Sequence, residues 1–166
     1  VPRVRGLRLR THPHRFDAGQ SLGFRRDLPF LAHPLQHHAS ATQGGDFVRD
    51  VIDMMGGEVV LDRAGLTVSG GDGISGIDVD LHDSSELTPV VAALCALADS
   101  PSIIRGVAHV RGHETERLAA LRTELTGLGA GVEETPDGLR ITPRPLHGGT
   151  FHTYADHRMV MAAAVL

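Results

Sequence analysis

An acidic and a basic side chain stand three residues apart where a helix is expected to begin. Glu114 and Arg117 occur in the run Val110–Leu118 (VRGHETERL), with His113 directly before the acid. A carboxyl group can give or take a proton, and a guanidinium can hold an anion beside it. These residues could therefore move protons on a bound anionic substrate.

The same run has a simpler explanation as a helix start. Acidic residues such as Glu114 and Glu116 are favoured in a first turn, because the N-terminal end of a helix is partly positive, and Thr115 could cap it. Arg117 fits this explanation poorly, because a cation in the first turn opposes the helix dipole. A bound anion at the helix start would account for it. The run is not the zinc-protease motif, because Arg117 occupies the place of the second histidine.

Two other predicted helix starts carry charged residues. Asp83–Pro89 (DSSELTP) places Glu86 at the head of a helix, and Tyr154–Met159 (YADHRM) does the same for Arg158. Each of these charged residues could simply belong to the start of its own helix and have no further role. If the elements pack side by side, however, all three starts converge on one surface. Arginine, glutamate and histidine side chains on that surface would suit an anionic substrate undergoing proton transfer.

The elements that must position these residues alternate between helix and strand, which indicates an α/β fold. Apolar spacing predicts helices over residues 46–55, 86–98 and 115–128 and from 158 onward. Strands are expected over 59–61, 66–68, 77–81, 102–105, 108–111, 132–134, 139–142 and 150–154.

The pattern contains an internal repeat. Gly56 and Gly129 are separated by 73 positions, as are Gly65 and Gly138. At this offset the apolar positions of one copy meet those of the other, and an aspartate, Asp83 in the first copy, recurs in the second. Chance matching of apolar positions is the alternative, but the glycine spacing favours two related α/β modules that share one core.

Residues 1–42 differ from the rest of the chain. They hold seven Arg and two acidic residues, a net of +5, whereas residues 43–166 hold nine Arg and eighteen acidic residues, a net of −9. They carry no groove-reading or base-stacking motif, so we do not expect nucleic-acid binding. Their composition favours a solvated or poorly ordered segment. We treat residues 1–41 as one atypical region and residues 42–166 as the folded domain.

Composition also argues against other classes of protein. All 16 basic residues are Arg, so the chain contains no Schiff-base or phosphate-loop lysine. No apolar run is long enough to span a membrane, and no secretory signal is recognised.

The single cysteine, Cys95, suits a small core residue in a reducing cytoplasm. Gly71–Gly76 matches Gly-x-Gly-x-x-Gly, but a strand is expected after it, so it indicates a strand connection. The eleven His residues lack metal-ligand spacing.

From about residue 42 onward, the sequence resembles the 5-enolpyruvylshikimate-3-phosphate (EPSP) synthases. Arg111–Leu118 resembles one signature of that family, and Asp80–Ala98 resembles its catalytic strand and helix, with Glu86 at the catalytic position. Tyr154–Met159 resembles its second phosphoenolpyruvate-binding arginine motif, and Thr42–Asp46 resembles the opening of an earlier repeat. The motifs occur in the family's order. The resemblance implies an inside-out α/β barrel of repeated βαβαββ units, of which this sequence holds a part.

The resemblance also implies a reaction. Shikimate 3-phosphate attacks C2 of phosphoenolpyruvate through its 5-hydroxyl, and the tetrahedral intermediate loses phosphate, in chorismate and aromatic amino-acid biosynthesis. Glu86 would contact shikimate 3-phosphate and accept the hydroxyl proton, Glu114 would protonate the methylene carbon, and His113 would help to hold shikimate 3-phosphate. Arg117 and Arg158 would clamp phosphoenolpyruvate. No metal and no organic cofactor is implied, and the full-length enzyme is expected to be a cytoplasmic monomer.

Parts of the family pattern are unmatched. The N-terminal domain with its lysine and arginine ligands is missing, a C-terminal lysine would follow residue 166, and residues 1–41 lack the Ser-Ser-Gln substrate motif. We therefore expect a fragment with little or no activity alone. Residues 1–41 would be translated out of frame or belong to a damaged or partial gene. Sequencing the coding DNA tests this, and an unbroken frame with independent support for these residues would contradict it.

Two alternatives to this function stay open. An enolpyruvyl transferase that acts on UDP-N-acetylglucosamine shares the fold but uses a loop cysteine as general acid, whereas Cys95 lies in the middle of a predicted helix. A non-catalytic anion-binding module could also keep the fold. Substitution of Glu86 and Glu114 distinguishes this module from an enzyme, in which catalysis should collapse while substrate binding largely survives.

Overall fold

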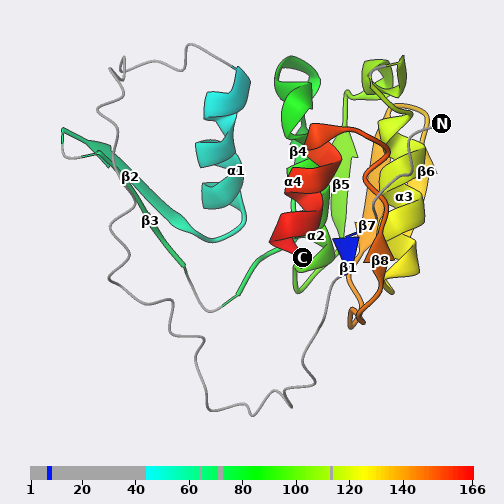
Figure 1. Ribbon diagram of the computed structural model, residues 1–166. Coiled ribbons are helices and arrows are strands. Elements are labelled where there is room, and N and C mark those ends of the chain that lie inside the picture. Colours follow the sequence, from blue (N-terminus) through cyan, green and yellow to red (C-terminus); the bar gives the residue numbers. More distant parts are fainter. Residues whose placement is uncertain (1–6, 9–43, 64, 71–72, 113) are drawn as a thin grey trace.

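One complete βαβαββ unit forms the centre of the structure (Figure 1). The structure is a computed structural model, and it describes residues 7–8, 44–63, 65–70, 73–112 and 114–166. The strands of the unit form one sheet in the order β4-β5-β7-β6, in which β4 and β5 are parallel and the other pairs are antiparallel. Its elements are β4 (Asp78–Asp80), α2 (Thr88–Ala96), β5 (Ser102–Arg105), α3 (Arg117–Gly127), β6 (Gly131–Thr135) and β7 (Gly138–Thr142). The α/β class and the βαβαββ unit expected from the sequence are confirmed.

Parts of two further units flank the complete one. Before it come a 3₁₀ helix, a short α-helix and a hairpin, which are η1 (Gly44–Phe47), α1 (Val48–Met54), β2 (Glu58–Asp62) and β3 (Gly65–Ser69). After it come β8 (Thr150–Phe151) and α4 (His157–Val165). The strand β1 (Leu7–Arg8) pairs antiparallel with β8. The other residues of segment 1–41 lie outside the described ranges, so the expectation for that segment stays a prediction.

The hairpins β2–β3 and β6–β7 confirm the internal repeat. Each strand of the first hairpin begins and ends 73 positions before its counterpart in the second. The pairing register is also the same, since Glu58 faces Ser69 and, 73 positions later, Gly131 faces Thr142. A positive φ recurs at Gly56 (89°), before β2, and at the matching glycine before β6. Local sequence therefore produces the same hairpin twice.

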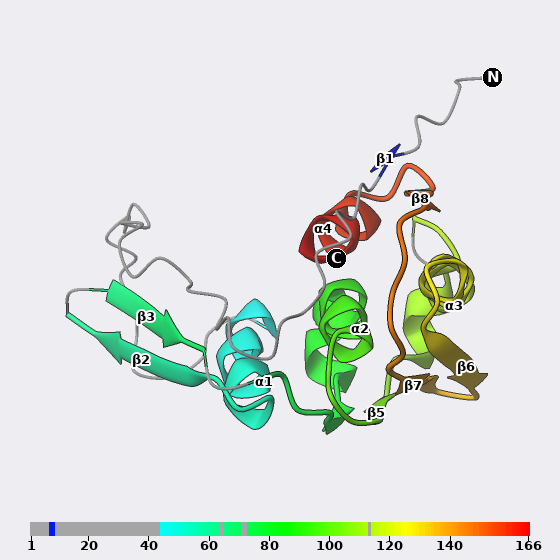
Figure 2. The same cartoon turned by 90° about the horizontal axis from the view of Figure 1, so that it is seen from below.

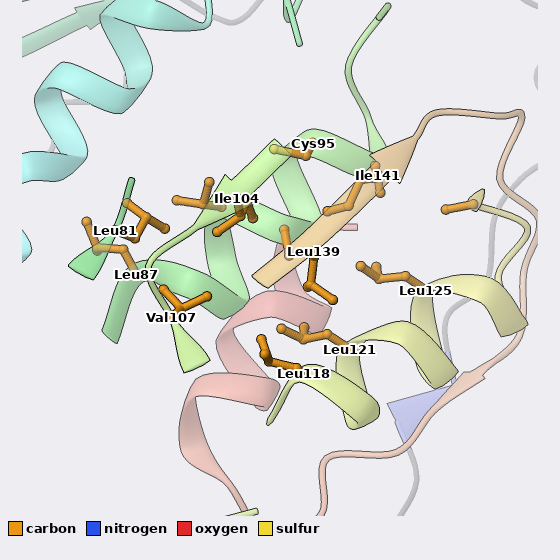
Figure 3. Close-up of a cluster of buried hydrophobic side chains, with 14 of the residues drawn as sticks. Leu81, Leu87, Cys95, Ile104, Val107, Leu118, Leu121, Leu125, Leu139 and Ile141 are labelled. Carbon is orange, nitrogen blue, oxygen red and sulfur yellow. The ribbon is translucent and has the colours of Figure 1, made fainter. Parts of the chain in front are cut away.

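The core of the complete unit lies between its sheet and its helices (Figure 2). Helix α2 is buried along most of its length, as an all-round apolar helix should be, and it lies between α4 and the sheet (Figure 2). Pro89 fits its first turn. Leucines of α3 and apolar residues of β7 meet over the same face of the sheet (Figure 3), and among the fully buried ones are Leu118, Leu121, Leu125, Leu139 and Ile141.

Two expected elements differ from those observed. The strand predicted over residues 108–111 is wrong, because Ala108–Gly112 forms a 3₁₀ helix (η3). The strand before it, β5, ends at Arg105, and the next residue, Gly106, has a φ of 75° and a position at which a Cβ atom would lie 2.1 Å from Asp80 Oδ1. The chain therefore turns there instead of continuing extended. The strand predicted over residues 150–154 is shorter in the structure and ends at Phe151, and the positive φ of Tyr154 is incompatible with a strand at that residue.

The described ranges contain no helix of the length and apolarity that crossing a lipid bilayer would require.

Candidate active site

Three helix starts meet on one side of the molecule. The first is the 3₁₀ helix η2 (His82–Leu87), which leads into α2 and carries Glu86. The second is the segment before α3, which carries Glu114, and the third is the start of α4, which carries Arg158. Arg158 Nη1 donates to the carbonyl oxygen of Glu86 at 3.2 Å, and His157 Nδ1 lies 3.1 Å from a carboxylate oxygen of Glu114. The convergence expected from the sequence therefore occurs.

The most buried charged groups of the site are Arg117, the first residue of α3, and Asp156. The Arg117 side chain is only 3% exposed, and its Nε donates to Asp156 Oδ2 at 2.7 Å. Burial opposes ionisation of Asp156, but hydrogen bonds from Arg117 and from the Arg158 backbone outweigh it, so the pKa of Asp156 lies below its ordinary value. Asp156 is therefore ionised at neutral pH, and its carboxylate fixes the guanidinium of Arg117 in the interior of the site.

Asp156 also begins α4. Its Oδ1 accepts a hydrogen bond from the backbone N–H of Arg158 at 2.8 Å, as an N-cap residue does. One carboxylate thus orients Arg117 through one oxygen and the start of α4 through the other. Asp156 therefore contacts both arginines expected to bind phosphoenolpyruvate, Arg117 at its side chain and Arg158 at its backbone.

The two carboxyl residues expected to transfer protons lie in different surroundings. Glu86 is half-buried at the junction of η2 and α2, and a Cβ atom on Gly45 would lie 3.9 Å from its Oε1. The backbone of η1 therefore runs past this carboxylate. The side chain of Glu114 is 47% exposed and faces His157. Each carboxyl residue is thus linked to the start of α4, Glu86 through Arg158 and Glu114 through His157.

The roles of two residues near the site were not identified from the sequence. The prediction that Thr115 caps α3 is wrong, because Glu116 is the N-cap and accepts a hydrogen bond from the backbone N–H of Ala119 at 2.8 Å. The sequence predicts a bound anion beside Arg117, whereas the structure pairs it with Asp156. The available signal was the recurrence of an aspartate at position 156 of the internal repeat.

Anions fit this site better than metal ions. Within the described ranges, Glu114, Asp156 and His157 offer three ligand atoms that lie within 4.8 Å of one another. Asp156, however, already accepts hydrogen bonds from Arg117 and from the backbone of Arg158, so a cation there would stand beside a guanidinium. We therefore assign no metal to this group. His113 lies outside the described residues, and its expected contact with shikimate 3-phosphate stays a prediction.

Cys95 does not contribute to the site. It is fully buried within α2, and burial raises the pKa of its thiol to about 11. A thiol enclosed in the core cannot reach a substrate, so it is not available as a general acid. This observation disfavours the enolpyruvyl transferases that use a loop cysteine.

The sequence profile of EPSP synthase (3-phosphoshikimate 1-carboxyvinyltransferase) matches residues 36–166, which is well over half of the chain. The chain belongs to the EPSP synthase family. The resemblance expected from the sequence motifs is thereby confirmed. The match to the EPSP synthase profile begins before residue 42, and the domain boundary between residues 41 and 42 stays a prediction.

Two known EPSP synthases extend this result. The 3-phosphoshikimate 1-carboxyvinyltransferase of Kocuria rhizophila is 58% identical over 125 residues, which are 75% of this chain and 28% of that protein. The solved structure of EPSP synthase from Acinetobacter baumannii covers 70% of this chain with a TM-score of 0.55 and 17% identity, so it supports the fold alone. This chain covers 31% of that structure. The sequence thus spans less than a third of the length of both EPSP synthases.

Proposed function

We propose that the complete protein containing this sequence transfers the enolpyruvyl group of phosphoenolpyruvate to the 5-hydroxyl of shikimate 3-phosphate and releases phosphate. The observation that carries the proposal is the meeting of two arginines and two carboxyl residues at three helix starts, in a chain of the EPSP synthase family. Both substrates are anions, and the planar guanidinium group binds carboxylates and phosphates through two parallel hydrogen bonds. The chain contains no Lys, so Arg supplies every fixed side-chain cation here.

Arg117 and Arg158 would hold phosphoenolpyruvate. Asp156 fixes the orientation of Arg117 through the 2.7 Å bond to Nε, and the carbonyl oxygen of Glu86 holds Arg158 through Nη1. Side chains held in this way lose little freedom when an anion binds, so more of the interaction energy is available for affinity. Water screens the buried Arg117 weakly, and the neighbouring Asp156 carboxylate offsets part of its charge, so its orientation contributes more to anion binding than its net charge does.

Glu86 and Glu114 would move the protons. As the hydroxyl oxygen of shikimate 3-phosphate bonds to C2 of phosphoenolpyruvate, Glu86 takes the hydroxyl proton and Glu114 gives a proton to C3. Phosphate then leaves C2 and takes up the proton held by Glu86, C3 returns its proton to Glu114, and the carbon–carbon double bond forms again. His113 would help to hold shikimate 3-phosphate. General acid–base steps of this kind contribute about 10²–10⁴-fold to a rate.

An exchange of segments tests the proposal. The 125 aligned residues of the Kocuria rhizophila enzyme are replaced by those of this sequence, and phosphate release is measured at steady state. We expect turnover in the hybrid, and we expect Glu86→Gln and Glu114→Gln each to lower its kcat by about 10²-fold or more while KM changes far less. The 166-residue chain alone is expected to show little or no turnover.

A matched control comes from β6. Glu133 is an exposed carboxylate on that strand, and Glu133→Gln should leave kcat and KM unchanged within about two-fold, as substitutions at exposed positions usually do. A folded hybrid that binds both substrates but releases no phosphate would support the non-catalytic anion-binding module instead. Full activity of Glu114→Gln would contradict the role of that residue as the acid.

We also propose that the complete enzyme is a cytoplasmic monomer that acts on small-molecule substrates alone. The buried thiol of Cys95, which fits a reducing compartment, supports the location. Light scattering of the hybrid tests the oligomeric state, and a stable dimer at micromolar concentration would contradict it.

A further inference from the structure

Glu124 is a buried carboxylate of α3 that the proposed reaction does not use. It lies seven residues after Arg117 on the same helix, so both side chains project from one face. Glu124 is 5% exposed, and buried carboxylates are stable only when other groups donate hydrogen bonds to them. The donors come from the segment between β8 and α4, which leads directly to Asp156.

Three interactions join Glu124 to that segment. Its Oε2 accepts a hydrogen bond from the backbone N–H of His152 at 2.8 Å and lies 3.3 Å from the Nδ1 atom of the same residue. Its Oε1 accepts a hydrogen bond from the Tyr154 hydroxyl at 2.6 Å. Burial and this bond raise the pKa of Tyr154 to about 12, so the tyrosine remains a donor at neutral pH. The Glu124 carboxylate thus binds the segment at two residues, His152 and Tyr154.

The segment that Glu124 binds, between β8 and α4, has an unfavourable backbone conformation. Tyr154 and Ala155 have φ values of 54° and 58°, and they are the two non-glycine residues with positive φ in the described ranges. This left-handed region is strained for residues that carry a Cβ atom, so surrounding contacts must stabilise it. The next residue is Asp156, whose two oxygens hold Arg117 and the start of α4.

The internal repeat supplies a comparison within the same molecule. At the offset of 73, Val51 stands in place of Glu124 and Leu81 in place of Tyr154. The loop that carries Leu81 does not adopt the left-handed conformation, and the φ of Leu81 is −107°. The left-handed turn therefore occurs in the copy that has the carboxylate and the tyrosine, and not in the copy that has two apolar residues.

We propose that Glu124 is a positioning residue, which holds Tyr154 and Ala155 in the left-handed turn and thereby places Asp156 against Arg117 and the start of α4. Without the carboxylate, the turn relaxes to negative φ, and Asp156 leaves both of its partners. That this relaxation also weakens phosphoenolpyruvate binding rests on the proposed function.

Amide hydrogen exchange of the 166-residue chain tests the positioning. The reporter is the backbone N–H of Arg158, which is bonded to Asp156. We expect Glu124→Ala to speed its exchange at least about 10-fold relative to amides of β7, and Glu124→Gln to have a smaller effect, because an amide can still accept one bond and donate another. Unchanged relative exchange in Glu124→Ala would overturn the proposal.

The control is Leu125→Ala on the neighbouring position of α3. Leu125 is fully buried in the core and has no hydrogen-bonding side chain, so its truncation destabilises the unit as a whole. Exchange of Arg158 and of the β7 amides should rise together in this variant. If Leu125→Ala reproduced the selective loss at Arg158, Glu124 would have a structural role alone, and the proposal would be wrong.

A double variant tests whether Glu124 offsets the backbone strain at Ala155. In the Glu124→Ala background, Ala155→Gly removes the Cβ penalty of the left-handed conformation. We expect it to slow the exchange of Arg158 again by about five-fold relative to Glu124→Ala, an effect of the size of one such penalty. Failure of glycine to restore protection would show that the turn is not what Glu124 stabilises, and would overturn the proposal.

The hybrid enzyme tests the functional consequence separately. Glu124→Ala should raise the KM for phosphoenolpyruvate about 10-fold or more with a smaller change in kcat, whereas Leu125→Ala should lower thermal stability without this rise in KM. An inactive hybrid would contradict the proposed function, and the exchange result would still decide the role of Glu124. If Glu124→Ala speeds the exchange of the Arg158 amide selectively but leaves the KM unchanged, only the expected effect on phosphoenolpyruvate binding is refuted.

Discussion

The hairpins β2–β3 and β6–β7 have the same length and register but very different burial. Leu66 and Val68 on β3 are 48% and 51% exposed, whereas their counterparts on β7, Leu139 and Ile141, are fully buried. In the sheet, β7 pairs with β5 as well as with β6, and helices cover its face, whereas β3 pairs with β2 alone among the described strands (Figures 1 and 3). Local sequence therefore determines the hairpin, and neighbouring elements determine whether it is buried.

The helix starts repeat this contrast. The buried pair Arg117 and Asp156 has Gly44 and Asp83 at the matching positions of the earlier copy. Asp83 is exposed, and a glycine cannot pair with it. The matching segments therefore carry an exposed aspartate in one copy and a buried ion pair in the other. Substitutions at matched positions can measure how much each difference contributes.

The largest difference is expected between the two aspartates. Asp156→Asn should lower the free energy of unfolding by about 3–5 kcal/mol, because it removes the carboxylate from a buried ion pair. Asp83→Asn should change it by about 0.5 kcal/mol or less. Urea unfolding of both variants at pH 7 measures the two values. Equal losses of unfolding free energy in the two variants would show that the ion pair between Arg117 and Asp156 adds no stability to the second copy of the repeat.

Acid unfolding provides a second measurement on the same aspartate. The pKa of Asp156 is lowered by folding, so the unfolded chain takes up a proton at higher pH than the folded chain does. Stability from this group is therefore present above its ordinary value of 3.8 and is lost as pH falls below it. Asp156→Asn should flatten the stability curve below about pH 4, whereas Asp83→Asn should leave its slope unchanged.

The two leucines should give the next largest difference. Leu139→Ala creates a cavity beneath α2 and α3 and should cost about 2–4 kcal/mol, whereas Leu66→Ala should cost about 0.5 kcal/mol or less. Thermal unfolding of both variants measures these losses. A large loss in Leu66→Ala would mean that β3 packs against a part of the protein beyond the described residues, and would remove the contrast.

Most of the fold could be predicted from the sequence because its elements have regular apolar spacing. The apolar residues of α3 and the two hairpins alternate with the expected periods, and the glycine offset located both hairpins within a residue or so of their observed bounds. The strand predicted over residues 108–111 failed because the close approach of Gly106 to Asp80, a contact between distant residues, ends β5. Periodicity carries no information on such contacts.

The candidate site was predicted only in part for a similar reason. Family motifs predicted site roles for Glu86, Glu114 and both arginines, which stay predictions, and the structure brings their helix starts together. They did not identify Glu124, which lies 28 and 30 residues before its partners in the sequence. A left-handed turn at Tyr154 also has no sequence signal, because it is held by tertiary contacts rather than by a glycine.

The glycines before the two hairpins should give a smaller difference. Gly129 and Gly56 both have positive φ, 111° and 89°, so alanine is strained at either position. A Cβ atom at Gly129 would also lie 3.0 Å from the carbonyl oxygen of Pro145, whereas at Gly56 the nearest atom is Ser75 Oγ at 3.8 Å. We expect losses of about 2 kcal/mol for Gly129→Ala and about 1 kcal/mol for Gly56→Ala in urea unfolding. A reversed order would contradict this account.

The smallest difference concerns Glu134 on β6, whose counterpart on β2 is Leu61. Arg111 donates to Glu134 at 2.7 Å and Arg122 does so at 2.8 Å, and these bonds hold the pKa of Glu134 below its ordinary value. The group is partly exposed, so water and salt screen the network. Glu134→Gln should cost about 0.5–1 kcal/mol at low salt and less at about 1 M salt.

Glu133→Gln is the matched control for this network, because Glu133 is exposed on the same strand and its side chain has the opposite orientation. It should change stability by about 0.5 kcal/mol or less at either salt concentration. The wild-type network should weaken below pH 4.5, the ordinary value of Glu134, because protonation of the unfolded chain then favours unfolding. A salt-independent loss in Glu134→Gln would mean that packing of the side chain, rather than its charge, stabilises the second hairpin.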